Sequence, residues 1–122
     1  MTNAHSEIRI VTIGGAVRPG NYTAKALAIV NAELASRETV TLETIDPAAL
    51  SLALPGLPPT DDGKALQEKV KAATAIILAT PEYHGSFSSV IKLVIENLGF
   101  PSVLSGKPVA LLGVAAGGIG AI

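Results

Sequence analysis

The 122-residue sequence contains no cysteine, and only 3% of its residues are aromatic. Without cysteine the chain has no disulfide, no thiolate metal ligand and no cysteine nucleophile, and a chain of this size without disulfides suits a reducing cytoplasm. It also lacks a basic stripe, because its nine basic and ten acidic residues are scattered and give a net charge of -1. Nucleic acid is therefore not an expected partner.

Long apolar runs are also missing. The N-terminal segment MTNAHSE lacks the apolar stretch of a signal peptide. The most apolar segment, residues 109–122, has no charge but contains four glycines, and it is shorter than the ~20 residues that a membrane span needs. We expect it to form a buried strand followed by a glycine turn. With 48% hydrophobic and 16% charged residues, the chain is expected to fold as one domain over residues 1–122.

Strand-like and helix-like patterns alternate along the chain, which predicts a parallel sheet with helices on its faces. Strands are expected at residues 8–13, 39–45, 74–79 and 108–114. Helices are expected at residues 22–35, 61–73 and 87–98, and the proline-containing residues 46–60 are expected to cross the surface irregularly. Ligands of such sheets bind beyond the carboxyl ends of the strands. Three loops are predicted there, at residues 14–22, 81–86 and 115–120.

The loop after the first predicted strand, GGAVRPGNYT at residues 14–23, has the composition of an anion site. Gly15 and Gly20 let the backbone turn tightly and approach a ligand. Free amides at the start of the following helix favour an anion through hydrogen bonds and the helix dipole, and Arg18 adds a positive charge. Side-chain donors follow at Asn21, Tyr22 and Thr23. The alternative interpretation is a plain strand-to-helix turn with a solvated Arg18.

The loop after the third predicted strand, TPEYHGS at residues 80–86, offers a surface for a planar heterocycle. The amides of residues 83–86 are expected to reach the polar edge of such a ring. His84 is either a proton donor or an exposed loop histidine, and no HxH or HxxH spacing supports a metal site. In the third loop, Gly117 and Gly118 suit either a backbone that lies close to a ligand or a simple turn.

Several stricter motifs are missing. No Lys-Ser/Thr follows the glycines of the first loop, and these glycines lack the G-x-G-x-x-G spacing. No serine lies in a G-x-S-x-G elbow, and Glu82 has no obvious second carboxylate with which to form a hydrolytic pair. The sequence therefore supports neither an ATPase, nor a dinucleotide fold, nor a hydrolase.

Together, the first loop and the segment PEYHGSFSSVIKLVIENLG at residues 81–99 resemble the NADPH-dependent FMN reductase family, which includes quinone, azo-dye and chromate reductases. The second segment is the more specific one, because its Pro-Glu-Tyr-(Asn/His)-Gly-Ser run precedes a helix with an internal lysine, here Lys92. The resemblance spans residue 8 to the end and implies a flavodoxin-like three-layer α/β sandwich, with a parallel sheet of strand order 2-1-3-4. Family members usually continue through another helix, a fifth strand and a last helix, and this sequence stops before them.

The resemblance also implies which residues bind FMN. The phosphate would be held by Gly15, Arg18, Gly20, Asn21, Tyr22 and Thr23. The isoalloxazine ring would lie against Pro81, Glu82, Tyr83, His84, Gly85 and Ser86, with its edge near Gly117 and Gly118. Ala16 stands where the family often has serine, and Asn21 where it often has serine or threonine. This exchange of two hydroxyl groups for one amide predicts a weaker hold on phosphate.

The favoured function is an FMN-dependent oxidoreductase in which NAD(P)H reduces the flavin and the flavin reduces a small acceptor such as a quinone or a free flavin. Because the flavin carries the redox chemistry, we expect neither a catalytic side chain nor a metal. One alternative is a flavodoxin-type electron carrier, although such carriers usually have a hydroxyl-rich phosphate loop and an acidic surface. Another is a truncated module without activity. A homodimer or homotetramer is expected from the resemblance and from the unpaired edge of the last strand.

Overall fold

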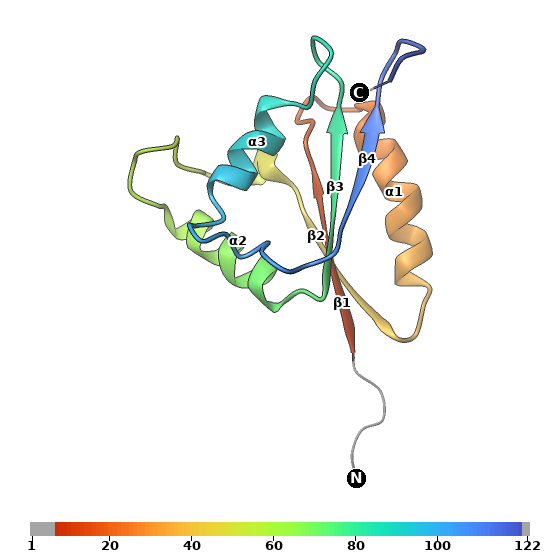
Figure 1. Ribbon diagram of the computed structural model, residues 1–122. Helices are drawn as coiled ribbons and strands as arrows, with labels where there is room; N and C mark the ends of the chain where they lie inside the picture. Colours follow the sequence, from red (N-terminus) through yellow and green to blue (C-terminus); the bar gives the residue numbers. More distant parts are fainter. Residues whose placement is uncertain (1–6, 121–122) are drawn as a thin grey trace.

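The structure is a computed structural model that describes residues 7–120. At its centre lies a four-stranded parallel sheet in the order β2-β1-β3-β4 (Figure 1). The strands are β1 (Ile8–Gly14), β2 (Val40–Ile45), β3 (Ala75–Pro81) and β4 (Val109–Val114). Helix α1 (Tyr22–Ala35) covers one face of the sheet, and helices α2 (Asp61–Ala72) and α3 (Ser89–Glu96) cover the other. The predicted flavodoxin-like architecture and strand order are confirmed.

Each helix begins where a polar side chain accepts a hydrogen bond from the backbone of its first turn. Asn21 caps α1, Thr60 caps α2 and Ser88 caps α3. This capping explains one error in the predicted boundaries: the last helix starts at Ser89 instead of residue 87, and Phe87 is exposed outside it. The irregular crossing before α2 contains one short 3-10 helix, Pro47–Ala49.

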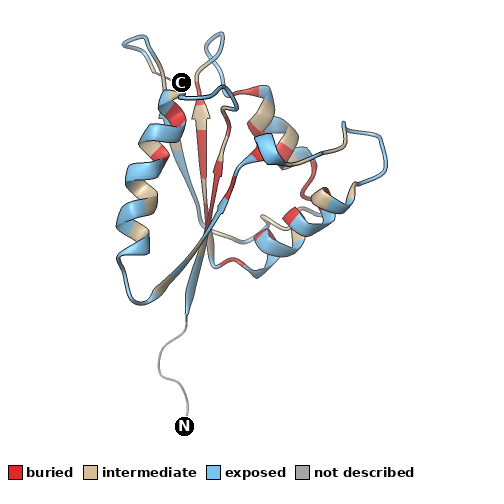
Figure 2. Cartoon of the chain, turned by 180° about the vertical axis from the view of Figure 1, so that it is seen from behind, coloured by how far each residue is buried: buried red, intermediate tan, exposed pale blue. Residues whose placement is uncertain are grey.

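The hydrophobic core lies mainly between the sheet and the pair α2 and α3. The strands contribute buried aliphatic side chains that include Val11, Ile13, Ile76 and Leu78. The two helices cover them with Leu66, Val70, Ile91 and Val94. Each such side chain contributes about 1.5–3 kcal/mol of hydrophobic stabilisation. Figure 2 shows the buried residues along the central strands, and this half of the molecule therefore anchors the loops at the ends of β1 and β3.

Helix α1 buries much less of its surface. Only Thr23 and Leu27 of this helix are buried, and the predicted apolar face is otherwise half-buried or exposed, with Ala24 and Ala28 open to solvent. Behind the helix, the buried Thr12 hydroxyl donates a 2.9 Å hydrogen bond to the side-chain oxygen of Asn31. This face of the sheet is thus held partly by a polar contact.

The prediction of a buried last strand is wrong. β4 is exposed or half-buried throughout, and Leu111 remains 79% exposed. Leu111 pairs in register with the buried Leu78, so both side chains lie on the α3 face of the sheet. Within residues 7–120 no strand pairs with the outer edge of β4, and no helix buries Leu111. The glycine turn predicted after β4 is present up to residue 120, and residues 121–122 lie outside the described part, as does most of the segment MTNAHSE.

Because the strands are parallel, the loops that follow β1, β3 and β4 emerge at one end of the sheet (Figure 1). These are the three loops that the sequence places at the ligand-binding edge. In the described part of the chain no helix has the length and apolar character required to span a bilayer.

Candidate functional site

The first loop, residues 15–21, is organised by the side chain of Asn21. Its amide nitrogen donates to the backbone carbonyls of Ala16 and Arg18, at 3.3 and 2.7 Å. Its oxygen accepts a 2.7 Å hydrogen bond from the backbone N–H of Ala24. The amide expected to contact a ligand is therefore fully engaged within the loop. Asn21 therefore shapes the first loop and caps α1.

The start of α1 offers backbone donors to a ligand. The first N–H groups of a helix have no acceptor inside the helix. The Asn21 side-chain oxygen accepts a hydrogen bond from only one of them, the N–H of Ala24. The N–H groups of Tyr22 and Thr23 have no other partner among the described residues. They carry the positive end of the helix dipole, and the exposed Arg18 of the same loop forms no ion pair with another residue of the range 7–120.

A cleft of about 390 Å³ adjoins this loop, between α1 and the end of β2. Arg18, Gly20 and Asn21 line it together with Thr44 and Asp46. Gly20 has a φ of 72°, which favours glycine, and a Cβ at this position would meet no atom within 4 Å. The outer side of the loop is therefore open, so that a ligand can approach its backbone. Of the predicted side-chain donors, Tyr22 is exposed and Thr23 is buried.

The second loop, residues 82–86, is a tight turn that satisfies most of its own amides. Tyr83 and Ser86 exchange backbone hydrogen bonds of 2.9 and 3.1 Å. The N–H of Gly85 donates to the carboxylate of Glu82, and the N–H of Glu82 donates to the carbonyl of Val114 at the end of β4. Of the four amides expected to reach a ring, only that of His84 lacks a partner among residues 7–120.

His84 and Gly85 occupy the centre of this turn with φ angles of 55° and 80°. Positive φ at both central residues defines a type I′ turn, which asparagine and glycine favour and which histidine also tolerates. This backbone requirement is sufficient to explain an Asn or His at position 84, before Gly85. It does not require that the imidazole take part in a reaction. The His84 side chain is exposed, and Pro81 is the buried last residue of β3.

The third loop is the least constrained of the three. Gly117 and Gly118 are exposed, and a Cβ on either would meet no atom within 4 Å. Between the second loop, α3 and β4 lies a mostly apolar cavity of about 390 Å³. It is lined in part by Ser86, Phe87, Ile91 and Leu111. The structure thus brings all three predicted loops to one edge, with the first and second in a defined shape and the third open.

Sequence reasoning missed the side chain that joins the first two loops. Ser88 was predicted only as part of a helix, yet its hydroxyl is buried and donates to the backbone carbonyl of Gly15. A serine just before an apolar helical stripe is an N-cap signal, so it would have placed the helix start correctly but not revealed this contact. Within residues 7–120, no three His, Asp or Glu side chains gather closely enough to hold a metal ion.

Comparisons with known proteins agree with this geometry. The profile of the NADPH-dependent FMN reductase family matches residues 8–122. The chain is 36% identical over 124 aligned positions to an NAD(P)H-dependent FMN reductase of Pseudomonas aeruginosa, covering 93% of this chain and 63% of that protein. It is 46% identical over 59 positions to an NADPH azoreductase of a Bacillus species, covering 48% of this chain and 33% of the azoreductase. The chain therefore spans less than two thirds of the length of these relatives.

Solved structures show the same fold. An NADH:FMN oxidoreductase in its apo form superposes with a TM-score of 0.73 at 26% identity, over 88% of this chain and 57% of that protein. The flavoenzyme FerB from Paracoccus denitrificans, an NAD(P)H:(acceptor) oxidoreductase, gives a TM-score of 0.73 at 19% identity, over 85% and 59% of the two chains. Fold, loop sequences and family profile agree, and the chain belongs to the NADPH-dependent FMN reductase family.

Proposed function

We propose that this protein is an FMN-dependent NAD(P)H oxidoreductase that reduces a small acceptor such as a flavin or a quinone. The observation that carries this proposal is the pair of loops at the ends of β1 and β3. One presents N–H groups without a partner among the described residues and an arginine, and the other is a hydrogen-bonded turn on the adjacent strand. The FMN reductases and azoreductases to which the chain is similar support the same reaction.

The residues present fit FMN. Arg18 and the N–H groups of Tyr22 and Thr23 would hold the phosphate, since an arginine beside a helix N-terminus is a common phosphate site. The backbone of residues 81–86 would form a wall for the ring, and the unpaired N–H of His84 would be its hydrogen-bond donor. Gly117 and Gly118 would lie at the ring edge. When bound, FMN supplies the redox chemistry by taking up hydride from NAD(P)H and passing electrons to the acceptor.

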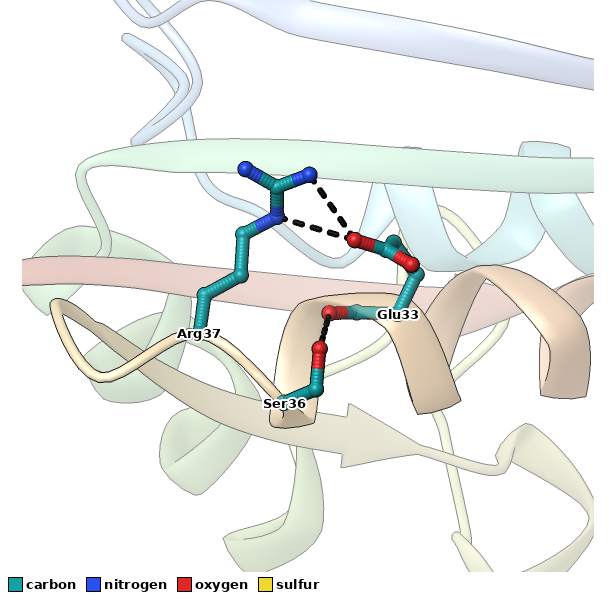
Figure 3. Close-up of polar contacts among 3 residues, drawn as sticks. All are labelled: Glu33, Ser36 and Arg37. Carbon is teal, nitrogen blue, oxygen red and sulfur yellow. Dashed lines mark hydrogen bonds and ion pairs between the residues drawn. The ribbon is translucent and has the colours of Figure 1, made fainter.

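Removal of Arg18 tests this assignment. We expect Arg18→Ala to raise the dissociation constant for FMN about 10- to 100-fold, because a charge-assisted hydrogen bond contributes roughly 1.5–3 kcal/mol. FMN binding is measured by quenching of its fluorescence. The matched control is Arg37→Ala, which removes the same charge at the other end of α1. There Arg37 forms an ion pair of 2.8 Å with Glu33, beside the Ser36 hydroxyl that donates to the Glu33 carbonyl (Figure 3).

Activity is measured separately, as oxidation of NADPH or NADH with a quinone or free flavin as acceptor. Turnover that requires FMN would support the reductase. Tight FMN binding without NAD(P)H oxidation would instead indicate an electron carrier. A protein that binds no FMN would refute the proposal, and equal FMN affinities of the two arginine variants would refute the assignment of Arg18 to the phosphate.

We also propose that the protein acts in the cytoplasm as a homodimer or homotetramer. The support for assembly is the number of large apolar side chains left exposed, among them Leu54, Phe87 and Leu111. The absence of cysteine agrees with a reducing compartment. Light scattering over a range of protein concentrations tests the oligomeric state, and a monomer at every concentration would contradict it.

A further inference from the structure

We propose that Ser88 is a positioning residue for FMN, holding the first loop at a fixed distance from the second so that one ligand can contact both. This inference rests on the proposed function. It concerns a side chain that lies beneath both loops and lines neither the phosphate end nor the ring wall described above.

The Ser88 side chain is 1% exposed and makes two hydrogen bonds. Its hydroxyl donates to the backbone carbonyl of Gly15 at 2.7 Å, and its oxygen accepts from the backbone N–H of Ile91 at 3.1 Å. A single hydroxyl therefore ties the start of the first loop to the first turn of α3. The Gly15 carbonyl is buried as well, so water cannot replace the Ser88 hydroxyl as its donor if that hydroxyl is removed.

The backbone of Ser88 makes a second connection, to the end of β3. Its N–H donates to the Thr80 hydroxyl at 2.9 Å, and that hydroxyl donates to the carbonyl of Pro81 at 2.9 Å, directly before the second loop. On the other side, the N–H of Gly15 donates to the carbonyl of Ala79 at 2.7 Å. Hydrogen bonds thus form a closed circuit through the first loop, the end of β3 and the start of α3.

The contact between Gly15 and α3 is as close as a glycine permits. A Cβ at Gly15 would lie 2.6 Å from Cγ1 of Ile91 and 2.9 Å from both the Ser88 hydroxyl and the Ala79 carbonyl. Sterics therefore prevent the loop from moving inward, and the Ser88 hydrogen bond restrains it from moving outward. Together they fix the separation of the two loops.

A fixed separation matters only to a ligand that spans both loops. FMN would place its phosphate at the first loop and its ring at the second, whereas riboflavin has the same ring without the phosphate. We therefore expect Ser88→Ala to weaken FMN binding about tenfold while leaving riboflavin binding within about twofold of wild type. Ser88→Thr keeps the hydroxyl and is expected to retain FMN affinity within about threefold.

The control is Thr12→Val, which also removes a buried hydroxyl and its one side-chain hydrogen bond, but this bond joins β1 to Asn31 in the second half of α1 and does not connect the two loops. It is expected to lower thermal stability as Ser88→Ala does, without changing the ratio of FMN to riboflavin affinity. Amide hydrogen exchange provides a readout without ligand: Ser88→Ala is expected to speed exchange in residues 14–23, and Thr12→Val is not.

The outcomes separate this inference from the function it rests on. Wild-type protein that binds no FMN would refute the proposed function, and hydrogen exchange would then decide the role of Ser88 alone. If wild type binds FMN but Ser88→Ala keeps the wild-type affinity ratio, the positioning role is wrong. Equal exchange in the first loop of Ser88→Ala and Thr12→Val would overturn it as well, as would a Ser88→Thr variant that folds but binds FMN no better than Ser88→Ala.

Discussion

The first and second loops follow adjacent strands, but they differ in how many of their backbone N–H groups are hydrogen-bonded within the protein. In the first loop the Asn21 side chain bonds to two carbonyls, and the N–H groups of Tyr22 and Thr23 have no partner in the described part of the chain. In the second loop Tyr83 and Ser86 pair with each other and the Glu82 carboxylate accepts from the N–H of Gly85, so that only the N–H of His84 lacks a partner among the described residues. An open loop whose N–H donors are available can bind an anionic group. A turn that is closed by its own hydrogen bonds can instead form a surface for a planar ring.

If the proposed function is right, this difference gives each loop a separate task. A phosphate is bound by N–H donors that converge on it, which a loop at a helix N-terminus supplies. Contact with a planar ring requires a surface that holds its shape. The first variant below is at Gly15, which packs between β3 and α3, and the later ones weaken one loop at a time.

Gly15→Ala should have the largest effect, because its Cβ would lie 2.9 Å or less from α3 and from the β3 backbone. We expect a loss of about 3 kcal/mol in the free energy of unfolding, as for strong overpacking, and no measurable FMN binding. Gly14→Ala is the control, since its Cβ would be 3.6 Å from the nearest atom, an ordinary contact with Leu27. Urea denaturation measures both, and similar losses in the two variants would contradict the steric account.

Asn21→Ala should affect the first loop alone. Loss of an N-cap costs about 1 kcal/mol, with a range of about 0.5–2 kcal/mol, and the loop also loses its two bonds to the carbonyls of Ala16 and Arg18. We expect weaker FMN binding and unchanged riboflavin binding. Thr60→Ala removes the corresponding cap of α2, away from the loops. If Thr60→Ala lowers FMN affinity as much as Asn21→Ala, the effect comes from general loss of stability.

Glu82→Ala should affect the second loop alone. It removes the carboxylate that accepts from the N–H of Gly85, and a hydrogen bond to a charged group contributes about 1.5 kcal/mol. We expect weaker binding of FMN and riboflavin in parallel, in contrast to Asn21→Ala. Glu82→Gln retains an acceptor and should recover most of the affinity. An equal loss in Glu82→Gln would mean that the negative charge itself acts on the ligand.

His84→Val should have the smallest effect of the series, about 1 kcal/mol of stability, because a β-branched residue is strained at a φ of 55°. His84→Asn keeps a side chain that tolerates this backbone and should match wild type in stability and in FMN affinity. Loss of turnover in a stable His84→Asn variant would show that the imidazole takes part in the reaction, which the turn geometry does not require.

The sequence predicted the fold well because its strongest patterns are local. The β-branched run of β1 and the apolar run of β3 each end near the observed strand boundary, and their parallel alternation with helices leaves few topologies. The apolar run of β4 predicted a buried strand, which is wrong, whereas the unpaired outer edge expected for the last strand is observed within residues 7–120. The apolar residues of β4 alone do not say whether a neighbour is present.

For the candidate site, the residue composition identified the three candidate loops. It did not predict which of their polar groups are hydrogen-bonded within the protein. Gly20 and Arg18 were identified from the type of residue alone. The engagement of Asn21, the closed turn around His84 and the contact between Ser88 and Gly15 depend on backbone angles and on residues far apart in the chain. The contact between Ser88 and Gly15 in particular has no local signature, because its two residues are 73 positions apart.

The hydrogen bond from Ser88 to Gly15 joins residues 73 positions apart. Contacts at such separation form late in folding, because a long segment must lose its freedom first. A chain emerging from the ribosome would carry the complete first loop long before it could hold that loop in place. Competence to bind a nucleotide that spans both loops would therefore arise only once α3 has docked on the sheet, which makes cofactor uptake a signal that this part of the chain has folded.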